Sequence, residues 1–101
     1  SAVRRLQVAN IANILRPCAK NEILILCGDF NAAPASSDLA ELREVLPYIY
    51  SSEEATYVKE PSRPPIDFFF CSAPLEVDIS VYSSNDLSDH NIVVATFDEA
   101  L

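Results

Sequence analysis

Three short segments of this sequence carry polar side chains that could form a chemical site. Asp29 and Asn31 lie two residues apart, Asp67 stands inside an apolar run, and Asp89 precedes His90, the single histidine of the chain. Carboxylates gather where a protein binds a divalent cation, because the ion offsets their mutual repulsion. Each segment alone is also typical of a turn or a loop, so their meaning depends on the elements that position them.

Asp67 is the most informative of these residues because residues 66–71 are otherwise apolar. A carboxylate in such a run is costly unless it is paired or hydrogen-bonded. A protonated His90 or a metal ion would satisfy it, since Lys59 and Arg63, the nearest cations in sequence, lie in a predicted loop. The alternative is an edge position at which Asp67 faces solvent.

Five apolar residues, 23–27, lead directly to the first two polar side chains. Their number and β-branched content predict a strand buried on both faces, which ends at Gly28, the only glycine. If the extended backbone continues, Asp29 and Asn31 point to the same side while Phe30 points into the core. An acid and an amide at the end of a buried strand are how α/β proteins present a site. The alternative is an Asx-type turn that simply ends the strand.

The spacing of apolar residues predicts two helices, each ended by a following proline. The first begins at a Ser1 cap, and its polar residues, Arg4 and Arg5 among them, are predicted to face solvent. The second begins at a cap in residues 36–38, with Glu41 placed as in a capping box. The apolar positions are Val8, Ile11, Ala12 and Leu15 in the first helix and Leu39, Leu42, Val45 and Leu46 in the second.

Strand patterns occupy the C-terminal part of the chain. Residues 66–71 predict a second buried strand, residues 75–82 alternate as in a half-exposed strand, and residues 92–97 predict a last buried strand. Residues 48–65 are predicted to form a loop, with at most a short strand at Thr56-Tyr57. The order of helix, strand, helix and three strands predicts an α/β fold in which two helices pack on a mixed sheet.

The composition narrows the classes of function. Half of the residues are hydrophobic, so the chain can bury a core. A formal net charge of −8 argues against a general polyanion binder, whose affinity comes mainly from Lys and Arg. The same charge is compatible with a metal site. The longest strongly apolar run, residues 23–27, is far too short to span a membrane.

The chain contains three cysteines, Cys18, Cys27 and Cys71, and no CxxC pair. Cys27 and Cys71 lie in apolar runs and are predicted to be buried. We predict three reduced thiols and an intracellular protein of undefined compartment. Scattered thiols and a single histidine argue against a zinc site.

The polar segments follow the order of a known set of motifs. The chain contains, in sequence, Gly28-Asp29-Phe30-Asn31, Thr56-Tyr57, Ile66-Asp67-Phe68-Phe69 and Ser88-Asp89-His90. In order and approximate spacing these resemble the motifs of the endonuclease/exonuclease/phosphatase superfamily of metal-dependent phosphoesterases. The resemblance covers nearly the whole chain from residue 23 onward. Many members carry arginine where Pro65 stands here, a departure that weakens assignment to a subfamily but touches no catalytic group.

The resemblance implies that residues 1–101 are the C-terminal part of a single domain, and thus half of a four-layered α/β sandwich. The N-terminal half of the family domain, which supplies a metal-binding Glu and further phosphate contacts, is not recognisable here. The absence of methionine also predicts a fragment. We therefore expect the chain to be inactive alone, to expose an apolar face, and to associate with the other half or with itself.

The resemblance also implies a role for each polar residue. Asp29 orients or deprotonates the attacking water and shares the metal with Asp89. Asn31 donates to the phosphoryl oxygens, and His90 contacts the scissile phosphate while Asp67 holds its other ring nitrogen. Phosphoryl transfer depends mainly on positioning and charge stabilisation, with Mg²⁺ (or Mn²⁺) as the implied cofactor.

The expected function is a Mg²⁺-dependent phosphodiester hydrolase that most resembles nucleases of the exonuclease or deadenylase type, with RNA or DNA as the partner. A phosphatase or phospholipase of the same fold, acting on inositol phosphate or sphingomyelin, is the alternative that the acidic charge mildly favours. A non-catalytic member that serves in assembly is a third. The sequence leaves open the number of metals, exo or endo cleavage, and the oligomeric state.

Overall fold

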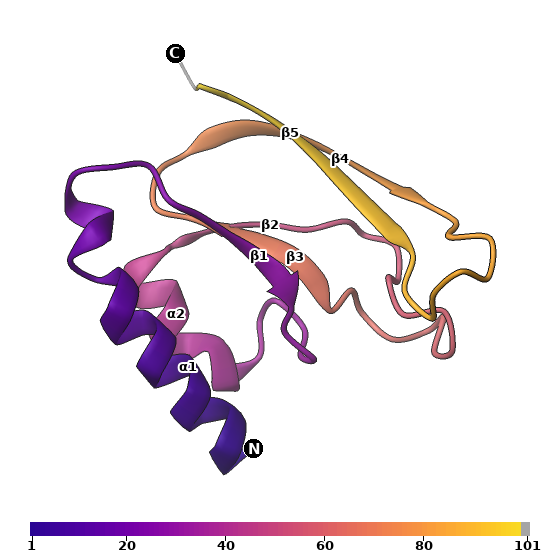
Figure 1. Cartoon of the computed structure of the whole chain (residues 1–101), viewed down its shortest axis with the longest axis horizontal. Helices are drawn as coiled ribbons and strands as arrows, with labels where there is room; N and C mark the ends of the chain where they lie inside the picture. The colour runs from indigo at the N-terminus through magenta and orange to yellow at the C-terminus, as the bar shows by residue number, and fades with distance from the viewer. Residues whose placement is uncertain (100–101) are drawn as a thin grey trace.

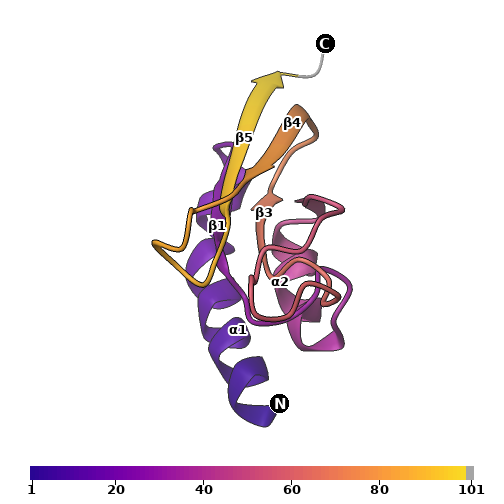
Figure 2. The ribbon, with the colours of Figure 1, turned by 90° about the vertical axis from the view of Figure 1, so that its right-hand side faces the viewer.

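The computed structural model describes residues 1–99 as helices on one side of a small sheet and a β-hairpin on the other (Figure 1). The elements are α1 (Ala2–Leu15), a 3₁₀ turn (Cys18–Lys20), β1 (Ile25–Asp29), a second 3₁₀ turn (Ser37–Leu39), α2 (Ala40–Val45), β2 (Tyr48–Tyr50), β3 (Asp67–Cys71), β4 (Leu75–Tyr82) and β5 (Ile92–Glu99). Seen from the side, the β4–β5 hairpin lies at the opposite end of the molecule from the helices (Figure 2).

Both predicted helices are present, and serine caps begin α1 and the 3₁₀ turn that leads into α2. The hydroxyl of Ser1 accepts from the backbone N–H of Arg4, and the hydroxyl of Ser36 accepts from that of Asp38. These caps satisfy backbone donors that have no partner within the helix. The predicted capping box is wrong, because Ser36 is the cap and it caps the 3₁₀ turn that precedes α2.

Asp38 does not cap the second helix; its carboxylate instead connects the segment before α2 to the N-terminal end of α1. Its buried carboxylate is paired with the amino group of Ser1 and accepts from Arg5 Nε and Arg4 Nη1, both at 2.8 Å. These three cations hold the pKa of Asp38 well below its ordinary value, the Ser1 amino group contributing most. Arg5 lies on an exposed face, as predicted, and Arg4 is partly exposed, but the sequence does not predict that both arginines also pair with Asp38.

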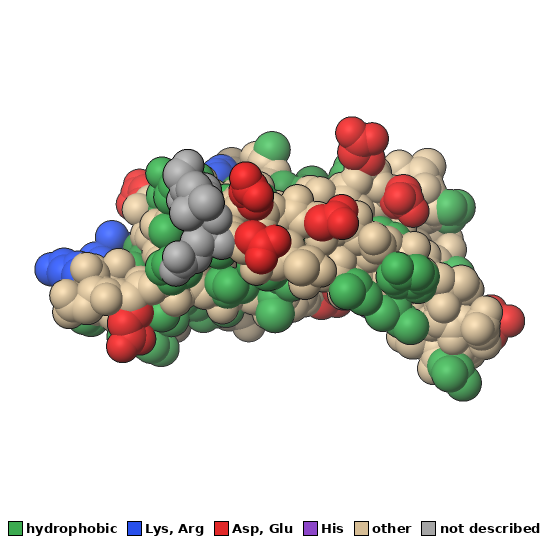
Figure 3. Space-filling view, turned by 90° about the horizontal axis from the view of Figure 1, so that it is seen from above, with side chains coloured by type: hydrophobic (Ala, Val, Ile, Leu, Met, Phe, Trp, Pro, Cys, Tyr) green, Lys and Arg blue, Asp and Glu red, His purple; other side chains and the backbone are tan. Residues whose placement is uncertain are grey.

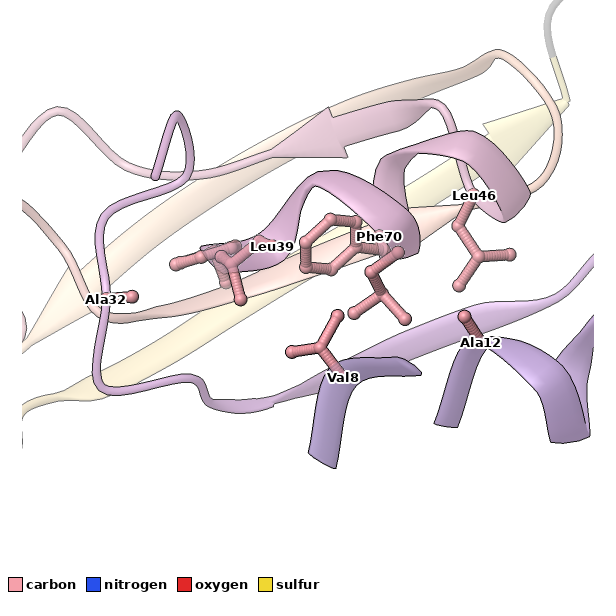
Figure 4. Close-up of a cluster of buried hydrophobic side chains, with 8 residues drawn as sticks. Val8, Ala12, Ala32, Leu39, Leu46 and Phe70 are labelled. Atoms are coloured by element: carbon pink, nitrogen blue, oxygen red, sulfur yellow. The ribbon is translucent and has the colours of Figure 1, made fainter. Parts of the chain in front are cut away.

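The hydrophobic core lies between the two helices and the sheet. Leu39, Leu42 and Leu46 on the α2 side are fully buried, as the predicted apolar stripe requires, and Phe70 of β3 is also fully buried. Figure 4 shows Leu39, Leu46 and Phe70 gathered with Val8 and Ala12 of α1, and Leu42 belongs to the same cluster. The central position of β3 explains this burial, since β3 pairs with β1 on one side and β2 on the other.

β1 is an edge strand and is not buried on both faces, so that prediction is wrong. Leu24 and Leu26 pack against the core, whereas Ile25 is 45% exposed and Cys27 is exposed. The predicted burial of Cys27 is wrong for the same reason, while Cys71 is buried as predicted. The helices cover only one side of β1, and an unbroken apolar run cannot reveal which faces will be covered.

β2 lies in the segment expected to be a loop, so the sequence does not predict it. It pairs antiparallel with β3, with Tyr48 opposite Cys71 and Tyr50 opposite Phe69. Three residues are too few to show a period, so the strand exists only because β3 offers a free edge.

β4 and β5 form a two-stranded antiparallel hairpin in which Val77 faces Phe97. Phe97 packs on Phe69 of β3, with ring centroids 5.4 Å apart, and this contact joins the hairpin to the first sheet. β4 is half-exposed as predicted, but β5 is not the buried strand expected: Ile92 is 51% and Val94 is 46% exposed. The outer face of the hairpin has no layer over it among residues 1–99, and its exposed acidic and apolar side chains are seen from above in Figure 3.

The predicted α/β class, with two helices packed on a sheet, is confirmed. In detail, the strands of residues 1–99 pair only antiparallel and are divided between a three-stranded and a two-stranded sheet. Within the same residues no helix has both the length and the apolar character needed to cross a bilayer.

Candidate active site

The pairing of β1 with β3 places the first two acids side by side. Asp29 is the direct cross-strand partner of Asp67 in the antiparallel register. Phe30 then turns into the core, where it packs on Phe68 and Phe70, as predicted. The extended backbone stops at that point, because Asn31 adopts the left-handed region with φ 49° and its N–H donates to Asp29 Oδ1 at 2.8 Å. The strand thus ends in an Asx-type turn that also presents Asp29 to the site.

The Thr56-Tyr57 segment brings Asp89 and His90 to Asp29 and Asp67. Tyr57 forms an isolated antiparallel bridge with His90, flanked by hydrogen bonds from Val58 N–H to Asp89 O (2.7 Å) and from Asn91 N–H to Thr56 O (2.8 Å). The ring of Tyr57 lies against the imidazole of His90, with centroids 5.3 Å apart. The loop that carries Asp89 and His90 is therefore held by backbone contacts on both sides of His90.

Thr56 links this bridge to β3. Its side chain is fully buried, and its hydroxyl accepts from the backbone N–H groups of Ile66 (3.1 Å) and Asp67 (3.3 Å). One buried residue thus contacts the start of the strand that carries Asp67 and, through its carbonyl, the residue after His90. The motif pattern in the sequence includes Thr56 but does not indicate this role.

Asp67 and His90 form the central contact of the site. His90 Nδ1 lies 2.8 Å from Asp67 Oδ2, and the two side chains are 27% and 21% exposed. The partner predicted for Asp67 from the cost of burying a carboxylate is therefore present. The hydrogen bond to Asp67 raises the pKa of His90 above its ordinary value; partial burial opposes this, and the charges of Asp67, Asp29 and Asp89 add to it.

Two further carboxylates approach the other ring nitrogen. His90 Nε2 lies 3.6 Å from Asp29 Oδ2 and 3.9 Å from Asp89 Oδ1. Asp29, Asp67 and His90 each offer a ligand atom within 4.8 Å of one another, and the carboxylates of this set suit Mg²⁺ or Mn²⁺. This Asp/Asp/His donor set fits a divalent cation.

Arg63 is the residue of this region that sequence reasoning missed. On sequence it is only a loop cation that is set aside as a partner of Asp67, yet its Nη2 donates to the side-chain oxygen of Asn31 at 3.0 Å and to the backbone oxygen of Asn31 at 3.3 Å. No signal in the sequence pairs the two, because 32 positions separate them.

A cleft of about 270 Å³ lies beside these groups. It is lined by Cys27, Gly28, Asp29, Asp67, Phe68, Phe69, Asn91 and Val93. Two carboxylates of the site thus face a space that a small group could enter. An apolar floor with a few convergent polar groups is the usual make-up of a ligand site.

One comparison with known proteins identifies the family of the chain. Residues 4–90 match the model of the Endonuclease/Exonuclease/phosphatase family. No curated protein sequence and no solved structure matches the chain. The match takes in every polar residue described above, up to His90, and covers most of the 101 residues. The chain therefore belongs to the endonuclease/exonuclease/phosphatase family, a family of phosphoesterases.

Proposed function

We propose that this chain supplies catalytic residues to a Mg²⁺-dependent phosphodiester hydrolase whose substrate is RNA or DNA. One observation carries the proposal: His90 is bonded to Asp67 at 2.8 Å through Nδ1 while its Nε2 faces Asp29 and Asp89. The carboxylate of Asp67 behind the ring orients a protonated imidazole. The carboxylates of Asp29 and Asp89 in front of the ring offer oxygen ligands for a metal ion. Phosphoryl transfer uses both kinds of group.

Each side chain takes a role from its contacts. Asp29 Oδ1 accepts a hydrogen bond from the backbone N–H of Asn31, and Asp29 Oδ2 is therefore available to orient or deprotonate a water molecule. Asn31 donates its amide N–H to a phosphoryl oxygen as charge develops there. Asp67 fixes the ring of His90 with Nδ1–H inward and favours its protonated form. Nε2–H then donates to the scissile phosphate and protonates the leaving oxygen.

Asp29 and Asp89 are the residues that would hold the divalent cation. When bound, such an ion neutralises charge on the phosphoryl oxygens and helps to orient them. The acidic character of the chain, with a net charge of −8, is compatible with this cofactor. We further propose that residues 1–101 form the C-terminal part of one family domain, whose remaining part completes the metal site.

Nucleic acid is the preferred substrate class because the Cys27–Pro34 segment and the closing Ser88-Asp89-His90 most resemble exonuclease and deadenylase members. The acidic charge favours the second candidate, a phosphatase or phospholipase that acts on a small or lipid substrate. The two differ in the molecule that carries the phosphate ester, so a panel of substrates distinguishes them.

The test is a substrate panel on the full-length protein with Mg²⁺. We expect cleavage of end-labelled single-stranded RNA or DNA, and little release of phosphate from inositol phosphate or of phosphocholine from sphingomyelin. Asp29→Ala and Asn31→Ala should each lower kcat at least about a hundredfold with a smaller change in KM, as for loss of a positioned base or an oxyanion donor.

Three results would change the assignment. Turnover of inositol phosphate or sphingomyelin without cleavage of nucleic acid would favour the second candidate. Near-wild-type turnover of either variant at saturating Mg²⁺ would contradict the roles of Asp29 and Asn31. A full-length protein that turns over no member of the panel would favour a non-catalytic function in assembly.

A further inference from the structure

The side-chain amide of Asn31 is held in one orientation by Arg63. Arg63 Nη2 donates to Asn31 Oδ1 at 3.0 Å. A guanidinium group carries only donors, so the amide oxygen of Asn31 must face it and the amide NH₂ must face away. An amide without such a partner would sample both orientations, one of which presents oxygen to an anionic substrate. The contact with Arg63 removes that second orientation.

Arg63 is itself anchored. Its Nη1 lies 3.2 Å from Glu60 Oε2, and its backbone N–H donates to Glu60 O at 3.0 Å, which closes a turn. Pro61 lies within this turn and Pro64 follows it, and both restrict the backbone. The side chain of Arg63 is 32% exposed, so Arg63→Ala also removes buried contacts of its aliphatic stem, whereas Arg63→Lys keeps part of them. The guanidinium thus bridges a proline-rich loop and the end of β1.

The other arginines that make side-chain hydrogen bonds in residues 1–99 contact groups away from the site. Arg4 and Arg5 bond to Asp38, and Arg43 bonds to the carbonyl oxygens of Pro34 and Ser36. Within the described chain, Arg63 is therefore the arginine whose guanidinium bonds to a residue of the site. It also brings a positive charge to a region that otherwise carries Asp29, Asp67 and Asp89.

We propose that Arg63 is a positioning residue that acts through Asn31. It holds the amide so that Nδ2–H donates toward the phosphoryl group, and its charge strengthens that donor by polarising the amide. This inference rests on the proposed phosphodiester hydrolysis for its consequence, but the orientation of Asn31 can be measured without any reaction. Arg63 has no contact with Asp67 or His90 in this assignment, so its effect should depend entirely on Asn31.

The first experiment follows the side-chain NH₂ resonances of Asn31 by NMR in the ¹⁵N-labelled full-length protein, with Asn31→Ala used for assignment. Arg63→Ala should shift these resonances and increase the mobility of the amide, and Arg63→Lys should restore part of the order. Lys59→Ala is the matched control, because it removes one exposed positive charge nearby and makes none of the hydrogen bonds to Asn31. An unchanged Asn31 amide in Arg63→Ala overturns the proposal, whether or not the protein is active.

The second experiment measures turnover of bis(p-nitrophenyl) phosphate by the same variants. Arg63→Ala should lower kcat about ten- to a hundredfold with a smaller effect on KM, as expected when a catalytic group is misplaced. In the Asn31→Ala background the same substitution should have no further effect. A loss that persists in that background overturns the proposal, as does an undiminished kcat in Arg63→Ala. If the wild type shows no turnover, the proposed function is contradicted but the role of Arg63 is not, and the NMR result then decides that role. Thermal unfolding of each variant shows whether it is folded.

Discussion

At the scale of single residues, the site depends on one hydrogen bond between a half-buried acid and the only histidine. Asp67 needs a donor because its strand is otherwise apolar, and His90 Nδ1 supplies it at 2.8 Å. The bond also decides which ring nitrogen faces Asp29 and Asp89. The two residues should therefore behave as one unit in any reaction that uses Nε2.

A double-mutant cycle tests this unit. In the full-length enzyme, Asp67→Asn should lower kcat/KM, because the tautomer of His90 is no longer fixed and its protonated form loses a charge partner. The double variant Asp67→Asn/His90→Ala should have a kcat/KM only slightly below that of His90→Ala alone. Additive losses would show that Asp67 acts through some other group.

The pH dependence of stability provides an independent check in metal-free protein. Asp67 raises the pKa of folded His90 above its unfolded value of about 6.5, so the protonated ring stabilises the fold. This contribution is fully present below about pH 6.5 and is lost as the pH rises through the higher folded pKa. Asp67→Asn should therefore lower the free energy of unfolding more at mildly acidic pH than at alkaline pH.

Denaturant unfolding at the two pH values measures the difference, and an NMR titration of His90 should show a lower pKa in Asp67→Asn. Asp78→Asn is the control, since it removes one exposed carboxylate from the outer face of the hairpin, away from the imidazole. A destabilisation by Asp67→Asn that does not vary with pH would contradict the proposed origin of the raised pKa.

At the scale of elements, the short Thr56-Tyr57 segment holds the site together. Thr56 contacts the start of β3 through its hydroxyl, and the bridge between Tyr57 and His90 aligns the loop after β4. Among residues 1–99, the bond between Asp67 and His90 is the hydrogen bond that joins β3 directly to that loop. The distance between Asp67 and His90 therefore depends on a segment that has no regular secondary structure of its own.

Thr56→Val should destabilise the protein by about 1–3 kcal/mol, because the buried N–H of Ile66 loses its acceptor while the shape of the side chain is kept. Thr56→Ser keeps the hydroxyl and should cost only about 0.5–1.5 kcal/mol, the usual effect of deleting one buried methyl group. Chemical denaturation compares the two. Equal stability of the valine and serine variants would show that the hydroxyl bonds contribute little.

At the scale of the whole molecule, the described chain is flat and exposes much apolar surface. Its extents are 39 × 38 × 20 Å, and its accessible surface of 6379 Å² exceeds the roughly 5,700 Å² expected for a compact monomer of this mass. Tyr82, Ile92 and Val94 are all about half exposed and share the outer face of the hairpin, where Tyr82 pairs with Ile92. Such a surface favours association.

We predict that the isolated 101-residue chain self-associates in the micromolar range. Val94→Lys should reduce the association, because it places a charge in the group formed by Tyr82, Ile92 and Val94. Thr96→Lys, on the same face but opposite Asp78, should have a smaller effect. Sedimentation velocity measures the distribution of species. A monomer at all concentrations would show that the exposed apolar side chains do not drive association.

Several features were determined by the sequence alone because they depend on local order along the chain. The apolar stripe of Leu39, Leu42 and Leu46 specified α2, and the alternation of residues 75–82 specified the half-exposed β4. The cost of a carboxylate in residues 66–71 is a local property as well; it predicts a partner for Asp67, either a protonated His90 or a metal ion, and the structure places His90 there.

Only the tertiary structure decided which faces and which pairs are used. The apolar runs of β1 and β5 both suggested burial, but an edge strand and a two-stranded hairpin each leave one face open, so Ile25 and Ile92 are exposed. β2 exists only through pairing with β3. The contacts of Asp38 with Arg4 and Arg5, and of Asn31 with Arg63, join residues more than 30 positions apart. Local periodicity carries no information on such distant pairs, because the chain must fold before their charges meet.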